Sequence, residues 1–193
     1  IALLWVWFIN LFNFMDGIDG LAGVETVTIG LGVFVIAISA GIGGTLPIFA
    51  LSLSAIGLGF LFFNWAPAKI FMGDVGSIPF GFLLAWLLLN LAQEGYMIQA
   101  IIIPAYYLAD ATATLVRRVF RGNKFWLPHR EHYYQKAVQR GLGHAYVSIV
   151  VAGANTLLIG LALLSLWSEI FGFLGGVIVI AFLLIYLRGG NGS

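Results

Sequence analysis

Residues 46–63 read LPIFALSLSAIGLGFLFF and contain no charged side chain. A helix needs about 20 predominantly apolar residues to cross the hydrocarbon core of a bilayer, so this stretch predicts a transmembrane helix. The whole chain has a similar character, because 61% of its 193 residues are hydrophobic and only 9% are charged. Soluble domains carry about 25% charged residues. Since an open sheet edge cannot satisfy its backbone groups in lipid, we expect an all-α, polytopic integral membrane protein.

Apolar runs of similar length recur on both sides of this stretch, and the mean hydropathy of the chain is +1.02. We predict a single membrane domain over residues 1–193, with about six full transmembrane helices plus a partial first one. The N-terminus has neither an initiator methionine nor a basic flank, so we also expect the C-terminal part of a longer protein. Full spans are expected over 24–42, 46–63, 78–91 with its flanks, 97–116, 145–166 and 170–187, and a partial one over 1–12.

The distribution of charge predicts the orientation of the chain. Seven of the nine Lys and Arg residues lie in the segment 117–144, which the positive-inside rule assigns to the cytoplasm. Counting spans from there places the loops near 13–23 and 64–77 on the same face. A net charge of +1 gives no reason to expect a nucleic-acid partner. The absence of cysteine excludes disulfides and thiolate metal sites.

The first polar motif, NFMDGIDGLAG, occupies residues 13–23 and carries Asp16 and Asp19, each followed by glycine. A carboxylate at a membrane boundary is costly unless it has a partner or a task. Two interpretations stay open on the residues alone: the aspartates end one helix and cap the next, or they bind a ligand. The further motifs typical of CDP-alcohol phosphotransferases and prenyltransferases do not accompany them.

The second motif, NWAPAKIFMGDVGSIPFG, occupies residues 64–81. Lys69 lies five residues before Asp74, and a helix is expected to begin near Ser77. A lysine beside a helix N-terminus favours phosphate binding. An aspartate there would repel phosphate unless a cation bridges the two, which indicates Mg²⁺. The alternative is that Asp74 or Ser77 caps the helix and Lys69 extends to the lipid headgroups.

The third motif spans residues 109–141, ADATATLVRRVFRGNKFWLPHREHYYQKAVQRG. Asp110 needs a partner near the membrane boundary, and Arg117 lies two helical turns further on the same face. His129 and His132 would share a face of a helix. Without cysteine or an HExxH pattern, histidines among so many cations indicate a polyanionic ligand rather than structural zinc. The alternative is a basic loop attracted to anionic membrane lipids.

The motifs NFMDGIDGLAG, NWAPAKIFMGDVGS and PHREHYYQ occur in the order and spacing typical of one membrane-enzyme family. The chain resembles the polyprenyl-phosphate N-acetylhexosamine-1-phosphate transferases, also called glycosyltransferase family 4. HREHYYQ and LADATATLVRR are more similar to the branch that initiates O-antigen synthesis than to the enzymes that make lipid I.

The resemblance implies roles for individual side chains. Asp74 is expected to be the principal Mg²⁺ ligand and Asp19 a second metal ligand, both of them catalytic, with Asp16 beside them. His129 and His132 match the catalytic histidine motif near the diphosphate and the sugar. Binding of the nucleotide or its phosphates is expected of Asn13, Asp16, Asn64, Lys69, Arg117 and Arg130.

The resemblance also implies a reaction on the cytoplasmic face of the bacterial inner membrane. N-acetylhexosamine 1-phosphate would pass from a UDP-sugar to undecaprenyl phosphate and release UMP, starting an O-antigen or another lipopolysaccharide or cell-wall polymer. Mg²⁺ is the expected cofactor, with Mn²⁺ as a substitute, and a homodimer is compatible with the family. Family members carry an earlier aspartate pair, which this chain lacks, so the segment alone could be inert. A transporter with embedded carboxylates is the alternative from another functional class.

Overall fold

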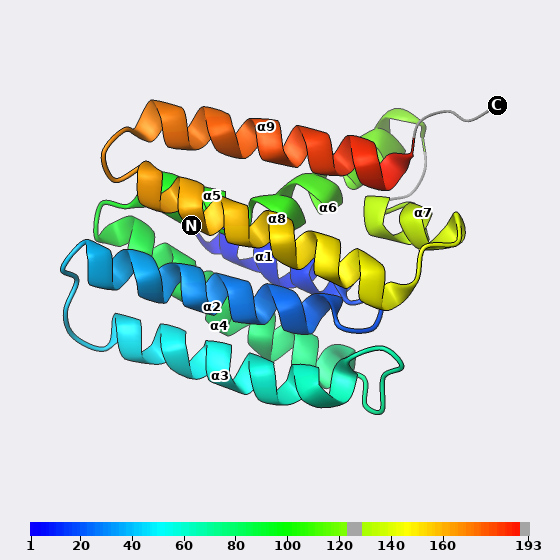
Figure 1. The fold of residues 1–193 in the computed structure, drawn as a ribbon, viewed down its shortest axis with the longest axis horizontal. Coiled ribbons are helices and arrows are strands. Elements are labelled where there is room, and N and C mark those ends of the chain that lie inside the picture. Colours follow the sequence, from blue (N-terminus) through cyan, green and yellow to red (C-terminus); the bar gives the residue numbers. More distant parts are fainter. Residues whose placement is uncertain (123–128, 190–193) are drawn as a thin grey trace.

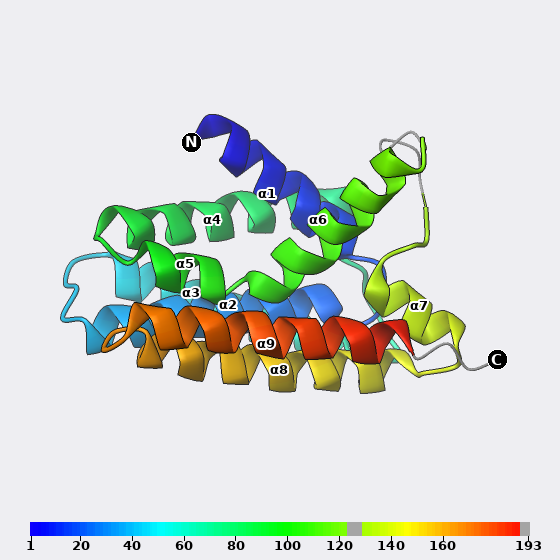
Figure 2. The same cartoon turned by 90° about the horizontal axis from the view of Figure 1, so that it is seen from above.

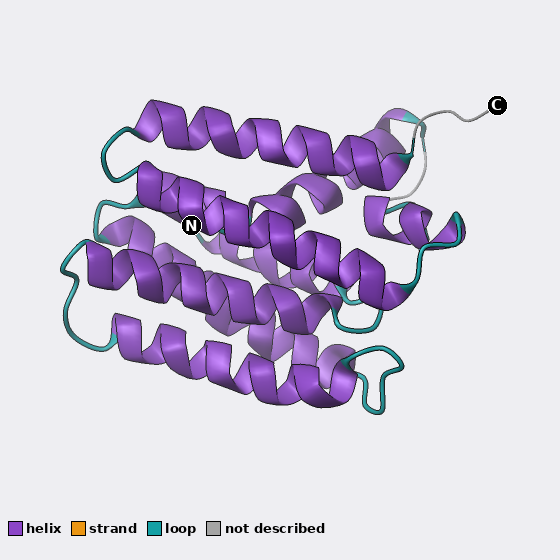
Figure 3. Ribbon diagram, in the orientation of Figure 1, coloured by secondary structure: helices purple, strands orange, loops and turns teal. Residues whose placement is uncertain are grey.

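The structure is a computed structural model that describes residues 1–122 and 129–189. Within these residues it contains helices and no strand, so the expected all-α membrane class is confirmed (Figure 3). The first helix, α1 (Ala2–Met15), is apolar but short for a membrane span. Five helices of the described part are long and apolar enough to cross a membrane: α2 (Leu21–Ser39), α3 (Leu46–Asn64), α4 (Gly73–Gln93), α8 (His144–Leu164) and α9 (Glu169–Arg188).

The span predicted over residues 97–116 is two helices instead of one, so the described part has five full spans rather than about six. A short helix, α5 (Met97–Ile102), ends just before Pro104, and α6 (Ala105–Phe120) starts directly after it. Proline has no N–H to donate and its ring clashes with the preceding turn, which breaks the helix there. Figure 2 shows α6 running obliquely to α5, and the short helix α7 (Tyr133–Gln139) lies at the same end of the molecule as the last turns of α6.

The central helix of the bundle is α2, which is buried along most of its length, whereas less than half of each of the other four spans is buried. It packs against α3 on one side and α8 on the other, and α9 packs on the outer side of α8 (Figure 1). Close approach of α2 and α3 depends on Gly30, where a Cβ would lie 2.7 Å from the carbonyl oxygen of Ala50. The α1 helix packs against α4.

Three polar connections lie at the same end of the bundle, on the right in Figure 1. These are residues 16–20 between α1 and α2, residues 65–72 between α3 and α4, and the region of α7 with the start of α8. We call this the polar end. The connections 40–45, 94–96 and 165–168 lie at the opposite end, which follows from antiparallel helices joined by short loops. The fold therefore gathers the three sequence motifs at one end.

Candidate active site at the polar end

Asp74 lies in the first turn of α4, because this helix begins at Gly73 and not near Ser77. The Nδ2 group of Asn13, in the last turn of α1, donates to Asp74 Oδ1 at 2.8 Å and to Ser77 Oγ at 2.7 Å. The α4 helix starts without a side-chain cap hydrogen bond at its N-cap, Met72. Asn13 thus holds the exposed Asp74 carboxylate at a helix N-terminus, where negative charge is favourable.

Asp16 directly follows α1, and it is the aspartate of the first motif that interacts with Asp74. Burial raises the pKa of the Asp16 carboxyl to about 6, and the neighbouring negative charge of Asp74 adds to the rise. Two carboxylates from separate motifs therefore lie close enough to oppose each other's ionisation. A divalent cation between them would remove that opposition, and Mg²⁺ is commonly held by one or two carboxylates plus substrate phosphates. The donor set thus fits Mg²⁺.

Asp19 has protein partners of its own. Its Oδ2 accepts from the backbone N–H of Ala68 at 3.2 Å and lies 3.4 Å from Nδ1 of His144, the first residue of α8. Its backbone carbonyl accepts from Ser148 Oγ at 2.9 Å. Gly20, not Asp19, is the N-cap of α2, so Asp19 is not that helix's cap. The side chain instead links the loop 65–72 to the start of α8.

Asn64 joins the first motif to the second. It is the last residue of α3 and is buried, with Oδ1 accepting from the Gly20 N–H at 2.9 Å and Nδ2 donating to the Ile70 carbonyl at 2.8 Å. Lys69, the residue before Ile70, has an exposed side chain. The structure therefore gives Asn64 a positioning role between the two loops, and it leaves Lys69 as a cation at the surface of the polar end.

Asp110 accepts several of the hydrogen bonds that hold the third motif together. This fully buried residue of α6 accepts hydrogen bonds from two neighbours on its own helix and from the start of α7. Its partners are Tyr106 Oη at 3.2 Å, Thr114 Oγ1 at 3.3 Å, the N–H of Tyr133 at 2.9 Å, the N–H of Tyr134 at 3.2 Å and His132 Nδ1 at 3.1 Å. One carboxylate thus anchors the HYY segment to α6.

Arg117 does not serve as the partner of Asp110. Its guanidinium donates to the Tyr133 hydroxyl and lies 4.9 Å from the centroid of that ring. Arg130 has an exposed side chain, and its carbonyl accepts from Gln139 Nε2 at 2.9 Å. In the described residues, Arg117 therefore supports α7, whereas Arg130 faces the surface.

His129 and His132 lie together, with ring centroids 5.0 Å apart. His132 is buried and is the N-cap of α7, while His129 is half-buried in the preceding loop. Burial lowers the pKa of His129, and its neighbours His132 and Arg118 lower it further. This favours the neutral imidazole, which can donate or accept a hydrogen bond. Residues 123–128 of the predicted loop 117–144 lie outside the described residues.

Tyr134 connects the third motif to the first. Its hydroxyl donates to the Phe14 carbonyl at 3.3 Å. Gly17 provides the space for this contact, because a Cβ at that position would collide with the Tyr134 hydroxyl. The α7 helix is therefore seated directly against the loop that carries Asp16.

Several polar residues of this region did not come from sequence reasoning. His144 and Ser148 contact the predicted site residue Asp19, and His144 could have been noticed as a histidine at the start of a span. Ser77, considered from the sequence only as a helix cap, accepts a hydrogen bond from Asn13. Glu25 is buried in α2 and accepts from Asn155 Nδ2 of α8 at 2.7 Å. Its signal was a charged residue inside an apolar run.

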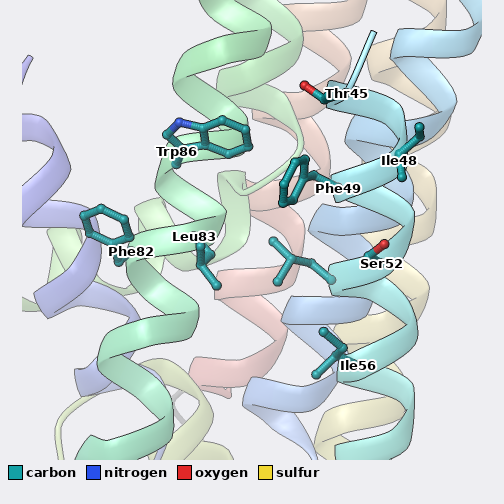
Figure 4. A pocket seen from close by; sticks show the side chains of 9 residues that line it. Thr45, Ile48, Phe49, Ser52, Ile56, Phe82, Leu83 and Trp86 are labelled. Carbon is teal, nitrogen blue, oxygen red and sulfur yellow. The ribbon is translucent and has the colours of Figure 1, made fainter.

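An apolar groove lies apart from these residues. It occupies about 620 Å³ between α3 and α4 and is lined by residues such as Phe49, Ile56, Phe82 and Trp86 (Figure 4). Thr45, which precedes α3, is among the lining residues, so the groove lies towards the end of the bundle opposite to Asp74. In residues 1–122 and 129–189 there is no group of three or more His, Cys, Asp or Glu that could hold a metal ion.

Comparison with known proteins gives matches to membrane transferases. The model of the family "Glycosyl transferase family 4" matches residues 1–92. A probable undecaprenyl-phosphate N-acetylglucosaminyl 1-phosphate transferase of Bacillus subtilis is 35% identical over 158 residues, which cover 78% of this chain and 43% of the relative.

A phospho-N-acetylmuramoyl-pentapeptide-transferase of Streptococcus pneumoniae is 39% identical over 119 residues, covering 60% of this chain and 35% of the relative. The chain thus spans less than half the length of the curated relatives it matches. Both relatives are named as phosphosugar transferases. The chain belongs to glycosyl transferase family 4.

Proposed function

We propose that this chain supplies the sugar-nucleotide side of a Mg²⁺-dependent transferase. The enzyme would move N-acetylhexosamine 1-phosphate from a UDP-sugar to undecaprenyl phosphate. The observation that carries the proposal is the Asn13 hydrogen bond, which holds Asp74 beside Asp16 at the polar end. Membership of a family of phosphosugar transferases supports the same reaction class.

The reaction conserves one phosphoanhydride linkage. A phosphate oxygen of undecaprenyl phosphate forms a bond to the β-phosphorus of the UDP-sugar. The bond from that phosphorus to the oxygen bridging the two phosphates breaks, and UMP leaves with that oxygen. Such chemistry depends on positioning and on stabilising negative charge, so it needs no covalent enzyme intermediate.

Each motif has a distinct task in this proposal. Asp74 and Asp16 would hold Mg²⁺, which supplies charge neutralisation for the diphosphate when bound. Asp19, fixed by His144 and the Ala68 N–H, keeps the first two motifs in register and is a further candidate ligand. Lys69 would contact a phosphate oxygen from the surface of the polar end.

The third motif would bind the diphosphate and the sugar from the opposite side. His129 and His132 supply imidazole hydrogen bonds, and Arg130 supplies a positive charge near them. Arg117 keeps α7 in place through Tyr133. These assignments require that the polar end faces the cytoplasm, which the concentration of Lys and Arg in residues 117–144 supports. Initiation of an O-antigen or a similar polymer is the proposed pathway.

The test is an assay of UMP release from UDP-N-acetylglucosamine with undecaprenyl phosphate and Mg²⁺. The full-length gene product and residues 1–193 should be compared, because the relatives are more than twice as long as the matched segment. We expect the full-length protein to release UMP, and we expect this release to stop when EDTA removes divalent ions. Mn²⁺ should restore part of the activity. Full-length protein that releases no UMP from any UDP-N-acetylhexosamine would contradict the proposal.

The observation that bears on the transporter alternative is the buried, hydrogen-bonded pair of Glu25 and Asn155. Transporter sites at membrane depth are typically formed by helices that are interrupted at the site. Both α2 and α8 are continuous helices at these two residues. The pair is therefore better explained as a contact that joins α2 to α8 beneath the Asp19 loop.

A further inference from the structure

A groove on the outer face of α8 and α9 starts at the polar end and runs into the apolar part of the bundle. Two adjoining hollows form it, one of about 370 Å³ and one of about 500 Å³, and both are lined by Phe182 and Tyr186. Among residues 1–122 and 129–189, no acidic residue lines either hollow. The first hollow contains Arg140 and Gly189, and the second continues past Tyr146, Val150, Leu157 and Ile178.

Arg140, which follows α7, is fixed at the polar mouth of this groove. Its Nη2 donates to the carbonyls of Tyr186 at 3.1 Å and Leu187 at 2.9 Å, at the end of α9. Gly189 has φ +76°, and a Cβ there would collide with the guanidinium. Since a guanidinium has five N–H donors, Nε and Nη1 keep donors for an anion within the described part of the chain. A fixed guanidinium is well suited to bind the oxygens of a phosphate group.

Two tyrosines mark the membrane boundary just inside this mouth. The hydroxyls of Tyr146 and Tyr186 are 2.6 Å apart and bridge α8 and α9. Tyrosine is enriched at the level of the lipid headgroups. From Tyr146 to Leu157 the groove runs about 16 Å along α8, at a rise of 1.5 Å per residue. That is about half of the ~30 Å hydrocarbon core, the depth of one leaflet.

We propose that this groove binds one anionic phospholipid of the surrounding leaflet. The phosphate of the headgroup lies on Arg140, and one acyl chain lies between α8 and α9. Charge complementarity favours an anionic headgroup, because the described residues of the mouth include a cation and no carboxylate. The length of the groove selects the tail, since a polyprenyl chain is far longer than one leaflet is deep. This site is separate from the proposed transferase site and does not depend on it.

Native mass spectrometry of the purified chain in detergent tests the proposal. Dioleoylphosphatidylglycerol is the anionic probe, and dioleoylphosphatidylcholine is the probe with the same tails and no net charge. We expect one phosphatidylglycerol to be retained preferentially. Arg140→Gln should weaken its apparent affinity about tenfold, the value of one charge-assisted hydrogen bond. Arg188→Gln is the matched control, because Arg188 is an exposed cation at the same end of α9 but does not line the groove.

A second variant separates binding from any effect of Arg140 on folding. Leu157 is exposed and lines the apolar part of the groove, so Leu157→Trp should obstruct the tail while Arg140 stays in place. Val177→Trp, at an exposed residue of α9 outside the groove, should retain the lipid.

Equal loss of lipid with Arg140→Gln and Arg188→Gln would overturn the proposal, because it would indicate general surface attraction. Equal retention of the two phospholipids would also overturn it. Displacement of the lipid by undecaprenyl phosphate, or a dimer that excludes lipid, would assign the groove to another occupant and reject the phospholipid.

Discussion

Asp74 and Asp110 are the same residue type in two contrasting parts of the polar end. Asp74 is exposed at the start of α4, and one side chain, Asn13, donates to it. Asp110 is fully buried in α6 and accepts from five groups of the protein. Because a carboxylate whose acceptor sites are used by the protein has few left for a ligand, Asp110 holds the fold together. Asp74 is open to a metal ion and phosphates.

The largest effect on stability should come from Asp110→Ala. This change leaves the buried N–H groups of Tyr133 and Tyr134 without an acceptor, which costs about 3–4 kcal/mol in the free energy of unfolding. For a chain of this size the midpoint of thermal unfolding in detergent should fall by about 10 °C. Asp110→Asn keeps one acceptor oxygen and should lose less. If the midpoint of thermal unfolding of Asp110→Ala stays within about 2 °C of that of the unmodified protein, Asp110 does not have the structural role that distinguishes it from Asp74.

Asp74→Asn should give the opposite pattern, a large loss of activity with an unchanged fold. Asparagine is isosteric but uncharged, so it should lower UMP release by the full-length protein about 100-fold or more. The free energy of unfolding should change by less than about 0.5 kcal/mol, because the side chain is exposed. Turnover that stays unchanged would show that Asp74 is not a metal ligand.

Asn13→Ala sharpens the comparison by leaving Asp74 in place without its support. Residues that orient a metal ligand typically contribute 10–100-fold, so we expect a loss of activity of about that size. Asn10 is the matched control, since it lies one turn earlier on α1 and its Nδ2 donates to the Val6 carbonyl of its own helix. Equal activities of the Asn13→Ala and Asn10→Ala proteins would contradict the role of Asn13.

The smallest expected effect concerns the contact between the two regions. Tyr134→Phe removes the hydrogen bond to the Phe14 carbonyl and should lower the free energy of unfolding by about 1 kcal/mol. Tyr133→Phe also removes one hydroxyl, but that hydroxyl joins Arg117 within the third motif. If the contact of α7 with the Asp16 loop matters for the site, Tyr134→Phe should reduce turnover more than Tyr133→Phe does. The reverse order would argue against this coupling.

The part of the fold that could be predicted is the part that hydropathy controls. Runs such as 46–63 are helical because lipid offers no partner for backbone N–H and C=O groups. The predicted span 97–116 was wrong as a single helix, although Pro104 within it carried the signal for a break. The transmembrane pattern alone also could not show that α6 leaves the direction of α5.

The candidate site could be predicted only as a set of residue types. The motifs identified Asp74, Asp19, Asp16 and the two histidines, because acidic residues, histidines and cations are few in so apolar a chain. The partners of these residues could not be predicted, since they come from distant segments. Asn13 and Asp74 are 61 residues apart, and Asp19 and His144 are 125 residues apart. Asp110 lies 22 residues before His132.

The sequence by itself determined the helical membrane class, the motifs and the concentration of polar residues between spans. These properties depend on side-chain hydropathy and on the spacing of residues along one chain. Only the tertiary structure decided that Asp16 opposes Asp74, that Asp19 binds the start of α8 and that Asp110 anchors the histidine segment. Hydrogen bonds and ion pairs act over a few ångströms, so such pairings depend on how the helices pack, and hydropathy carries no information about that.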